Sequence, residues 1–446
     1  MHRRPAHRPR AVLIALGALL LTTVLAACGA ATPPPAATPV ALAATAAPPT
    51  VAPPTTIPAT ASPSPQPPAT ATVTVTATAT ATRAPASATP IPPTATATPR
   101  PPTATATTAP PTATRPPVAA APPTTPVGGP PLTLADVFPP RDLDSLGLDP
   151  TRLRTLVATG DVIPARSVDT IIRKRGDDFA YPLAATKDLL RSGDLTVINL
   201  EAPLIERCPP HDEGFTFCGR PGFIATLKDA GIDVATLENN HIGNYGMAGI
   251  NETIQRLNQA GISWARRDRP AIVDMRGLKV GFLAFNGVGE EFDRDQIAAA
   301  LRALRPQVDI LAVAFHWGAE YVDVPTSAPG IAPDNPVAIA HLAVDNGADL
   351  VIGNHPHWVQ AAETYKGKYI TYAHGNFVFD QMWSYETRVG MVGRYTFYDN
   401  QLVRVEYVPV LIQNYAQPVR LQGQPAEQAL SNMAAASRKL AARLDR

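Results

Sequence analysis

Apolar runs alternate with helical stretches along the chain from residue 153 onwards. The apolar runs have the length of buried strands and cover residues 153–159, 195–199, 233–237, 279–285, 308–315 and 348–352. The helical stretches between them lie around residues 179–191, 222–230, 247–259, 294–304 and 336–346. This alternation predicts a layered α/β architecture.

The pattern changes in the C-terminal third of the chain. Residues 368–374 ("KYITYAH"), 393–399 ("GRYTFYD") and 401–410 ("QLVRVEYVPV") alternate in a way that is typical of antiparallel strands. The Ala-rich stretch 425–445 predicts a final helix.

Six of the strand-like runs end in a short polar motif. In α/β sheets, ligands bind outside the carboxyl ends of the strands. Six polar motifs at six strand ends therefore predict one shared crevice, and five of the nine His fall in them. The motifs are Gly160-Asp161, Asn199-Leu200-Glu201, Glu238-Asn239-Asn240-His241, His316-Trp317-Gly318, Gly353-Asn354-His355-Pro356-His357 and His374-Gly375-Asn376.

The "HPH" triplet raises the question of why two His stand one residue apart. Pro356 favours an extended backbone at His355. Residues two apart in an extended chain face the same side, roughly 6.6 Å apart at the Cα atoms. Two imidazoles would then serve a two-metal site, in which the ions lie about 3.5–4 Å apart. The alternative is a polar turn whose His bond to backbone atoms.

The side chains in these motifs are oxygen and imidazole ligands without thiolates. Such a set suits Zn, Mn, Fe or a similar divalent ion. Each residue also has an ordinary alternative: Asp161 as a helix N-cap, Glu201 as a capping carboxylate and Asn240 in an Asx turn. Glu320 and Tyr321 are interpreted as surface residues.

The first 28 residues read as an export signal, with a basic start and an apolar run that ends in Leu25-Ala26-Ala27-Cys28. This ending resembles a bacterial lipobox, which implies lipidation of Cys28 and an extracytoplasmic protein anchored to the cell membrane. The alternatives are an uncleaved anchor helix and a plain signal. Residues 29–130 are rich in Pro, Thr and Ala and predict a disordered stalk.

Residues 131–446 form the predicted globular domain, and its charge is mildly acidic. Seven of the 38 Lys and Arg precede Asp136, whereas all 37 Asp and Glu lie from Asp136 onwards. A nucleic-acid partner is therefore not expected. Cys208 and Cys218 lie in an exported loop, where a disulfide is favoured over two free thiols.

The motif set resembles the CapA family of bacterial capsule-synthesis proteins, which are linked to poly-γ-glutamate production. The matching stretches are "GDVIPAR", "NLEAPL", "LENNHIGNYGMAGI", "HWGAEY", "ADLVIGNHPHWVQ" and "YAHGNFVFDQ", between about residues 153 and 382. That family is related to calcineurin-like metallophosphoesterases. The resemblance therefore implies a four-layer α/β/β/α sandwich around one or two divalent ions.

The resemblance also implies roles for single residues. His241 resembles a His that contacts substrate phosphate and assists the leaving group. Arg166, Arg220 and Asn239 are expected to bind an anionic substrate, although either Arg could equally form a surface ion pair. The implied metal ligands are Asp161, Glu201, Asn240, His316, His355 and His357.

Three positions depart from the family pattern. Ile163 stands where the metallophosphoesterases have the His of Asp-x-His, so one metal position lacks a ligand. Asn244 stands where many CapA sequences have Asp. His374 stands where "YSLGN" is more usual, and it is a possible extra ligand or proton donor.

Two functions remain open from the sequence. The first is a metal-dependent hydrolase of a phosphoester or related bond, acting in capsule biosynthesis. The second is a non-catalytic subunit that binds or exports an anionic polymer beside membrane-bound capsule-synthesis proteins. The lost first-motif His and the predicted lipid anchor with its stalk are the cues for the second function, which is the alternative; the first function is the one we expect.

Overall fold

The structure is a computed structural model that describes residues 129–445. The predicted signal peptide with Cys28, and the predicted stalk up to residue 128, lie outside the described residues. Among residues 129–445, no helix combines the length and apolar character needed to span a bilayer.

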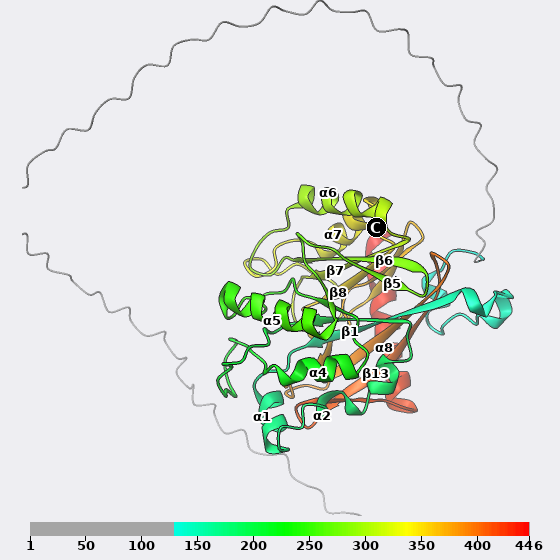
Figure 1. Ribbon diagram of the computed structural model, residues 1–446. Helices are drawn as coiled ribbons and strands as arrows, with labels where there is room; N and C mark the ends of the chain where they lie inside the picture. The colour runs from blue at the N-terminus through cyan, green and yellow to red at the C-terminus, as the bar shows by residue number, and fades with distance from the viewer. Residues whose placement is uncertain (1–128, 446) are drawn as a thin grey trace, which may run out of the picture. The chain divides into compact units, whose positions relative to one another are not determined.

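Two β-sheets lie at the centre of the described part of the chain (Figure 1). The first sheet has the order β14-β13-β12-β1-β2-β3-β4, with β11 paired to β1, and the second has the order β5-β6-β7-β8-β10-β9. The strands are β1 (Leu153–Val162), β2 (Leu195–Leu200), β3 (Val234–Thr236), β4 (Ser263–Ala265), β5 (Ala271–Met275), β6 (Leu278–Asn286), β7 (Ile310–His316), β8 (Leu350–Asn354), β9 (Ala362–Tyr365), β10 (Lys368–Thr371), β11 (Asn376–Val378), β12 (Val389–Tyr398), β13 (Gln401–Gln413) and β14 (Gln417–Arg420).

Helices cover the outer face of each sheet, with α6 and α7 at the top of Figure 1 and α1, α2 and α4 at the bottom. The α-helices are α1 (Ser167–Lys174), α2 (Tyr181–Ala184), α3 (Lys187–Leu190), α4 (Gly222–Asp229), α5 (Gly246–Ala260), α6 (Arg294–Leu304), α7 (Pro336–Asp345) and α8 (Gln424–Leu444). Short 3-10 helices lie at η1 (Leu134–Asp136), η2 (Asp144–Leu146), η3 (Pro150–Arg152) and η4 (Arg305–Gln307).

Three apolar clusters separate these layers. Leu156 and Ala158 of β1 point between the two sheets, whereas Val157 points to the helices beside the first sheet. This alternation is the two-residue period of a strand. Leu311 and Val313 of β7 face α6 and α7 in the third cluster. The predicted four-layer α/β/β/α sandwich is therefore confirmed.

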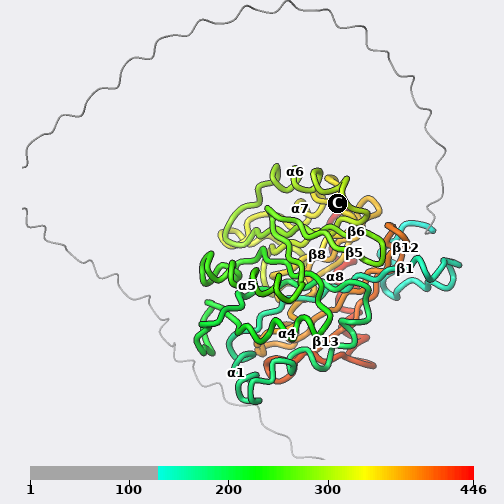
Figure 2. Tube along the Cα trace, in the orientation of Figure 1, coloured from blue at the N-terminus to red at the C-terminus, as the bar shows by residue number. Residues whose placement is uncertain are grey.

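The last helix, α8, contacts β9 of one sheet and β13 of the other. Ala429 and Met433 enter the core between the sheets, while Ala436 and Leu440 join the cluster outside the second sheet. Figure 2 shows α8 behind the strands, and β12 beside β1. The helix therefore closes one side of the sandwich.

The sequence prediction missed several short elements. The predicted helix at 179–191 is two short helices, α2 and α3, and α1 was not predicted. Five missed strands, β4, β5, β9, β11 and β14, are three to five residues long. Runs of this length are too short to display a reliable two-residue period.

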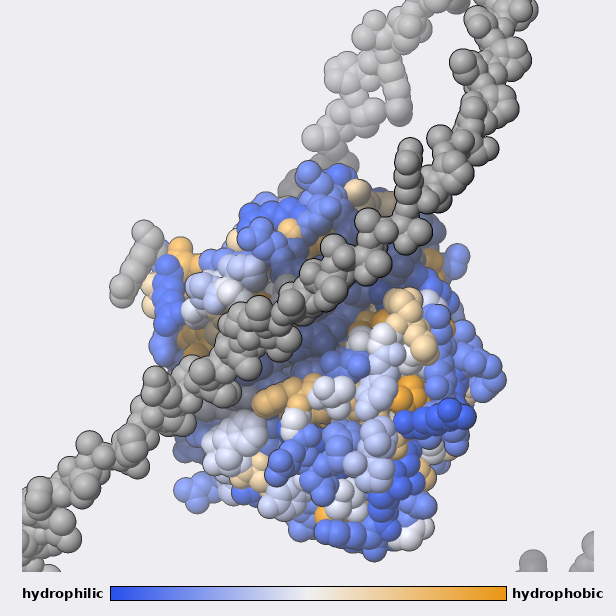
Figure 3. Space-filling view, turned by 90° about the vertical axis from the view of Figure 1, so that its left-hand side faces the viewer, coloured by the Kyte–Doolittle hydropathy of each residue, from blue (hydrophilic) through white to orange (hydrophobic). Residues whose placement is uncertain are grey.

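Parallel pairing brings the polar motifs to one edge of the sandwich. Asp161 lies beside Asn199 on β2 and beside Asn376 on β11. In the second sheet, His316 lies beside Asn354. The loops that follow these strands are at the left of Figure 1. Figure 3 faces that side and shows a hollow in a mostly polar surface, with apolar patches next to it.

Gly353 allows the backbones of β8 and residue 372 to approach closely. A Cβ atom at Gly353 would lie 1.9 Å from the carbonyl oxygen of Tyr372. We expect Gly353→Ala to lower the free energy of unfolding by about 3 kcal/mol, because the backbone must shift to remove the overlap. Urea unfolding followed by circular dichroism measures this change.

Gly243 offers the matched control for that measurement. No atom lies within 4 Å of a Cβ placed at Gly243. Gly243→Ala should therefore stay within about 0.5 kcal/mol of the unchanged chain. Equal unfolding midpoints for the two variants would contradict the close approach at Gly353.

Candidate metal centre

Five of the six predicted ligands are buried together where the strands end. Asp161, Glu201, His316, His355 and His357 are each at most 4% exposed. Burial of five ionisable side chains without charge compensation is unfavourable, so such a group marks a functional position. Asn240, the sixth predicted ligand, is partly exposed beside them.

The first group of potential ligands consists of Asp161, Glu201 and His316, with one ligand atom from each lying within 4.8 Å of the others. Nε2 of His316 is 3.3 Å from Oε1 of Glu201 and 2.9 Å from Oδ1 of Asn240. Two atoms that bind one ion at ~2.1 Å and at right angles are ~3 Å apart. These separations therefore suit neighbouring ligands of a single ion.

The second group consists of Glu320, His355 and His357, again with ligand atoms within 4.8 Å. Nε2 of His355 lies 3.8 Å from Oε1 of Glu320. Glu320 is exposed, as expected of a surface residue, with a side-chain exposure of 37%, but its carboxylate lies at the edge of the buried His pair. Tyr321 is half-buried rather than superficial, with its ring centroid 6.2 Å from that of His357.

The predicted extended backbone at His355 is wrong. His355 has φ +95° and His357 has φ +57°. Both values lie in the left-handed half of conformational space, which is strained for a residue with a Cβ atom and is often found at functional sites. The two rings nevertheless lie 5.9 Å apart, so the turn brings both imidazoles to the same site.

Asn199 links the two carboxylates of the first group. Its Nδ2 atom donates to Oδ1 of Asp161 at 2.8 Å and to Oε2 of Glu201 at 3.2 Å. Its Oδ1 atom accepts from Nδ2 of Asn239 at 3.0 Å. Asn199 therefore holds one oxygen of each carboxylate and leaves the other oxygen available for an ion.

Asn239, a predicted substrate contact, is engaged by the protein itself. Its Nδ2 atom also donates to the carbonyl of Leu200, and its Oδ1 atom accepts from the backbone N–H groups of His241 and Ile242. The structure thus places Asn239 behind the ligands, where it fixes the loop that carries Asn240 and His241.

The free atoms of the buried groups fit a bound cation. Oδ2 of Asp161, Oε1 of Glu201 and both ring nitrogens of His355 are buried without a hydrogen-bond partner. Buried polar atoms are nearly always satisfied in folded proteins. Divalent ions at the two groups would bind the two carboxylate oxygens and one ring nitrogen of His355, and such oxygen and imidazole atoms are suitable ligands.

Two His are electrostatically prepared as neutral ligands. Burial lowers the pKa of His316 to about 3 and lowers the pKa of His355 well below its usual value. A metal binds neutral imidazole, so no proton has to leave either ring near neutral pH.

The pKa values of His357 and Glu201 are both raised, for different reasons. Burial works against the charged form of His357, but the Asp161 carboxylate, 3.3 Å from its Nδ1 atom, raises its pKa to about 9. Burial and the neighbouring Asp161 charge raise the pKa of Glu201 well above its usual value. An ion would reverse both effects, because it favours the carboxylate and displaces the imidazole proton.

His241 lies beside the first group and is held in one tautomer. Its Nδ1–H donates to Oδ1 of Asn244 at 3.1 Å, and the same oxygen accepts from the backbone N–H of Phe217 at 2.6 Å. Burial lowers the pKa of His241 to about 4. The ring is therefore neutral near neutral pH.

The two predicted anion-binding Arg both form ion pairs. Arg166 pairs with Asp380, and its guanidinium lies 5.0 Å from the ring centroids of Phe217 and Phe379. Arg220 pairs with Asp169 at 2.6 Å and with Asp177. The Arg166–Asp380 pair is buried, with side-chain exposures of 9% and 5%, so it is not the surface ion pair that the sequence left open, whereas Arg220 is partly exposed.

Two positions that depart from the family pattern are fully buried. Ile163 packs with Ala202, Phe217 and Phe379 in a small apolar cluster, so nothing there replaces the missing His. His374 lies 2.8 Å from the hydroxyl of Tyr395, and burial lowers its pKa to about 4. His374 belongs to neither group of potential ligands.

Cys208 and Cys218 are joined in a disulfide. His211 lies close to both sulfurs, but the disulfide removes the thiolates that a metal would need there. The closed loop carries Phe217, whose ring centroid is 4.2 Å from that of His241. The disulfide therefore constrains the loop that packs against His241.

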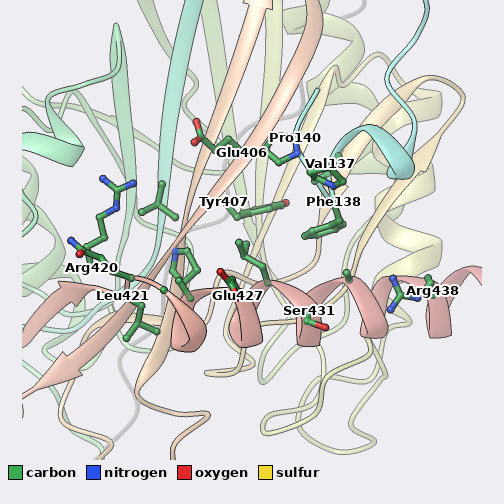
Figure 4. Close-up of a pocket in the computed structure, with 18 residues that line it drawn as sticks. Val137, Phe138, Pro140, Glu406, Tyr407, Arg420, Leu421, Glu427, Ser431 and Arg438 are labelled. Carbon is green, nitrogen blue, oxygen red and sulfur yellow. The ribbon is translucent and has the colours of Figure 1, made fainter. Parts of the chain in front are cut away.

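A separate pocket of about 860 Å³ lies between residues 137–140, β13 and α8 (Figure 4). Phe138 and Tyr407 stack inside it, and Glu427 and Ser431 of α8 face it. None of the predicted ligands lines this pocket. It is therefore distinct from the candidate metal centre.

The family model of bacterial capsule synthesis protein PGA_cap matches residues 155–381, which include both groups of potential ligands. The chain belongs to this family. The PGA_cap match confirms the resemblance predicted from the motifs, and its limits agree with those of the motif set. The predicted signal and stalk lie outside the match.

Two curated CapA proteins are similar to the chain. The capsule biosynthesis protein CapA of Bacillus anthracis is 27% identical over 287 residues, which cover 58% of this chain and 67% of the relative. The PGA biosynthesis protein CapA of Bacillus subtilis is 27% identical over 274 residues, covering 56% of this chain and 70% of the relative.

Similarity to solved structures is weaker. A Staphylococcus aureus protein provisionally named a 5′-nucleotidase, in complex with alpha-ketoglutarate, is 16% identical and has a TM-score of 0.40. The match covers 63% of this chain and 58% of that protein. A similarity at this score carries no argument about function.

Proposed function

We propose that this chain acts in the biosynthesis of a bacterial capsule polymer of the poly-γ-glutamate type, through a site that uses one or two divalent ions for hydrolysis. The family and the names of its curated relatives support the biological role. The observation that carries the chemical role is the pair of ligand groups, in which every member except Glu320 is buried and which contain unsatisfied oxygen and imidazole atoms.

The residues have distinct parts in this proposal. Asp161, Glu201 and His316 would hold one ion, and Glu320, His355 and His357 would hold a second. Mn, Zn or Fe would suit these ligands. Such an ion supplies Lewis acidity and a more acidic bound water.

Other residues of the chain would act around the ions. Asn199 keeps the carboxylates of the first group oriented, and Asn240 lies at the edge of the group where it meets solvent. His241, as a neutral ring with Nδ1–H held by Asn244, would accept a proton or a hydrogen bond through Nε2. Arg166 would stabilise negative charge if a substrate group displaced Asp380 from it.

We also propose that the protein works outside the cytoplasm and is held on the cell membrane by lipid on Cys28. The basic start, the apolar run and the small residues before Cys28 support this location. Capsule-synthesis proteins in the same membrane would then be its partners.

A non-catalytic role in binding or exporting the polymer is the second candidate. Its supporting observation is Ile163, which is buried among apolar side chains where the metallophosphoesterase motif has a metal-binding His. A polymer-binding subunit could keep the ions for structural reasons without hydrolysis.

Metal removal distinguishes the two candidates. We expect the purified full-length chain to hydrolyse a generic phosphodiester or a γ-glutamyl polymer slowly with Mn²⁺, Zn²⁺ or Fe²⁺, and to lose this activity in a chelator. Polymer binding without hydrolysis under any metal condition would support the second candidate and contradict the first.

A further inference from the structure

A second charged pocket adjoins the candidate metal centre at Asn240. This pocket has a volume of about 550 Å³ and is lined by Asn240, Arg266, Arg267, Asn286 and Glu290, among other residues. Asn240 connects this pocket to the first ligand group, because its Oδ1 atom lies 2.9 Å from Nε2 of His316. Its volume is in the range of small-molecule sites, which is about 300–1,000 Å³.

Arg266 and Arg267 directly follow β4, and a single buried carboxylate holds both. Glu238 is 5% exposed; its Oε1 atom accepts from Nε of Arg266 and its Oε2 atom accepts from Nε of Arg267, both at 2.9 Å. Glu238 begins the "ENNH" motif that also carries Asn240. The metal centre and the two Arg are therefore fixed by the same short loop.

This arrangement leaves donors available in the pocket. The carboxylate of Glu238 accepts from Nε of Arg266 and contacts both Nε and Nη2 of Arg267. Nη1 of Arg267 and the two terminal nitrogens of Arg266 are therefore the donors left to the pocket that both residues line. A fixed guanidinium fork suits a carboxylate or phosphate group. Side-chain exposures of 20% for Arg266 and 31% for Arg267 leave both accessible to a ligand.

With Glu238, two acidic residues at the rim bring three negative charges beside the two Arg. Glu290 accepts from Nη2 of Arg267 at 2.6 Å and is 48% exposed, and Asp268 lies 3.8 Å from Nε of Arg266. Exposed ion pairs of this kind are worth only about 0–1 kcal/mol. An incoming anionic group can therefore replace Glu290 at Arg267 with little loss.

We propose that Arg266 and Arg267, oriented by Glu238, form a subsite for the carboxylate groups of an acidic polymer that extends from the metal centre. The choice of a polycarboxylate rests on the proposed function, whereas the subsite itself rests on the geometry. A polymer whose backbone lies at the ions would place a neighbouring acidic side group across Asn240, toward the two Arg. The subsite would set both the register of the polymer and the preference for acidic chains.

Binding of a short γ-linked glutamate oligomer to the full-length chain tests this proposal. We would measure it by isothermal titration calorimetry, with a chelator present so that ions do not contribute. Arg266→Gln and Arg267→Gln should each weaken binding about tenfold or more, because each removes a charge-assisted hydrogen bond. An oligomer with amidated side groups should not bind, and excess inorganic phosphate should compete only weakly.

Two further variants separate this effect from loss of folding. Arg269 lies in the same turn but stacks on Trp264 and donates to its carbonyl, so Arg269→Gln should leave binding within about twofold. Glu290→Gln removes the carboxylate that accepts from Nη2 of Arg267 and should tighten binding by up to about fivefold. A gain of affinity cannot result from misfolding. Thermal melting checks that each variant is folded.

The outcomes also separate this inference from the proposed function. Equal weakening by Arg266→Gln and Arg269→Gln, or no tightening by Glu290→Gln, would overturn the subsite. Metal-dependent hydrolysis without oligomer binding would overturn the subsite and leave the proposed metal centre in place. Oligomer binding that depends on Arg266 and Arg267 in a chain that never hydrolyses would support the subsite and reject the hydrolase.

Discussion

Replacing His355 and His357 together by Gln should reduce metal-dependent hydrolysis by more than 100-fold. Loss of an outer partner of a metal ligand already costs about 10–100-fold in affinity or activity, so loss of two ligands should exceed that range. Both rings are buried, and neither nitrogen of His355 has a partner within the described part of the chain. Initial rates with saturating Mn²⁺ measure the effect.

His341 provides the matched control for these His replacements. It lies on α7, and its Nε2 atom is 2.8 Å from Oε1 of Glu363, outside both ligand groups. His341→Gln should keep turnover within about threefold, as expected of a residue remote from the chemistry. Similar losses in His341→Gln and in the double variant would mean that the effect is structural, and would contradict the ligand assignment.

Replacing Glu201 by Gln should stabilise the metal-free protein while it abolishes tight metal binding. In the absence of an ion, burial and the nearby Asp161 charge disfavour the Glu201 carboxylate, which is why its pKa is raised. Gln keeps the shape and removes the charge. With an ion bound, the carboxylate becomes a ligand, and its removal should then be strongly destabilising.

The pH dependence of this variant has a definite sign. A carboxyl whose pKa is raised by folding stabilises the fold fully below its unfolded value of about 4.5, and this contribution is lost as the pH rises through the folded value. The melting temperature of the metal-free Glu201→Gln variant should therefore exceed that of the unchanged chain by a margin that grows with pH. Thermal melts in chelator between about pH 5 and 8 measure this margin.

Added metal should reverse the difference in melting temperature between the unchanged chain and the Glu201→Gln variant. Mn²⁺ or Zn²⁺ should raise the melting temperature of the unchanged chain, because ligands that bind only the folded state stabilise it. The same addition should leave Glu201→Gln nearly unchanged. A variant that is less stable than the unchanged chain in chelator would contradict the account of Glu201.

Much of the candidate metal centre could be predicted from the sequence because parallel strands end at the same edge of a sheet. Each apolar run gave a strand, and the residue after its last apolar position had to lie at that edge. This reasoning placed Asp161, Glu201, His316, His355 and His357 together, as the structure does. The C-terminal helix was predicted from its Ala-rich composition, and the antiparallel strands β12 and β13 were predicted from their alternating pattern.

Residues on long loops could not be placed in this way. Glu320 follows β7 by four residues, and only the tertiary path of its loop brings its carboxylate near His355. Its place in "HWGAEY", close behind His316, was the available signal. Arg266 and Arg267 are similar, because β4 is three residues long and its end gave no recognisable pattern.

The strained backbone conformation of His355 could not be predicted from the sequence either. The rule for residues before Pro favoured an extended His355, but the observed φ of +95° shows that tertiary contacts override this local preference. Local rules describe what the chain prefers alone, whereas the site fixes both imidazoles against Glu320 and Asp161.

Crystallographic anomalous scattering from the full-length chain grown with Mn²⁺ tests the central claim most directly. The account predicts strong peaks within the rim formed by Asp161, Glu201, His316, His355 and His357, at one or both ligand groups. The same map from the His355 and His357 double variant should lose the peak at the second group. An ordered rim without any peak, or peaks only elsewhere on the molecule, would contradict the claim that these buried side chains hold a metal.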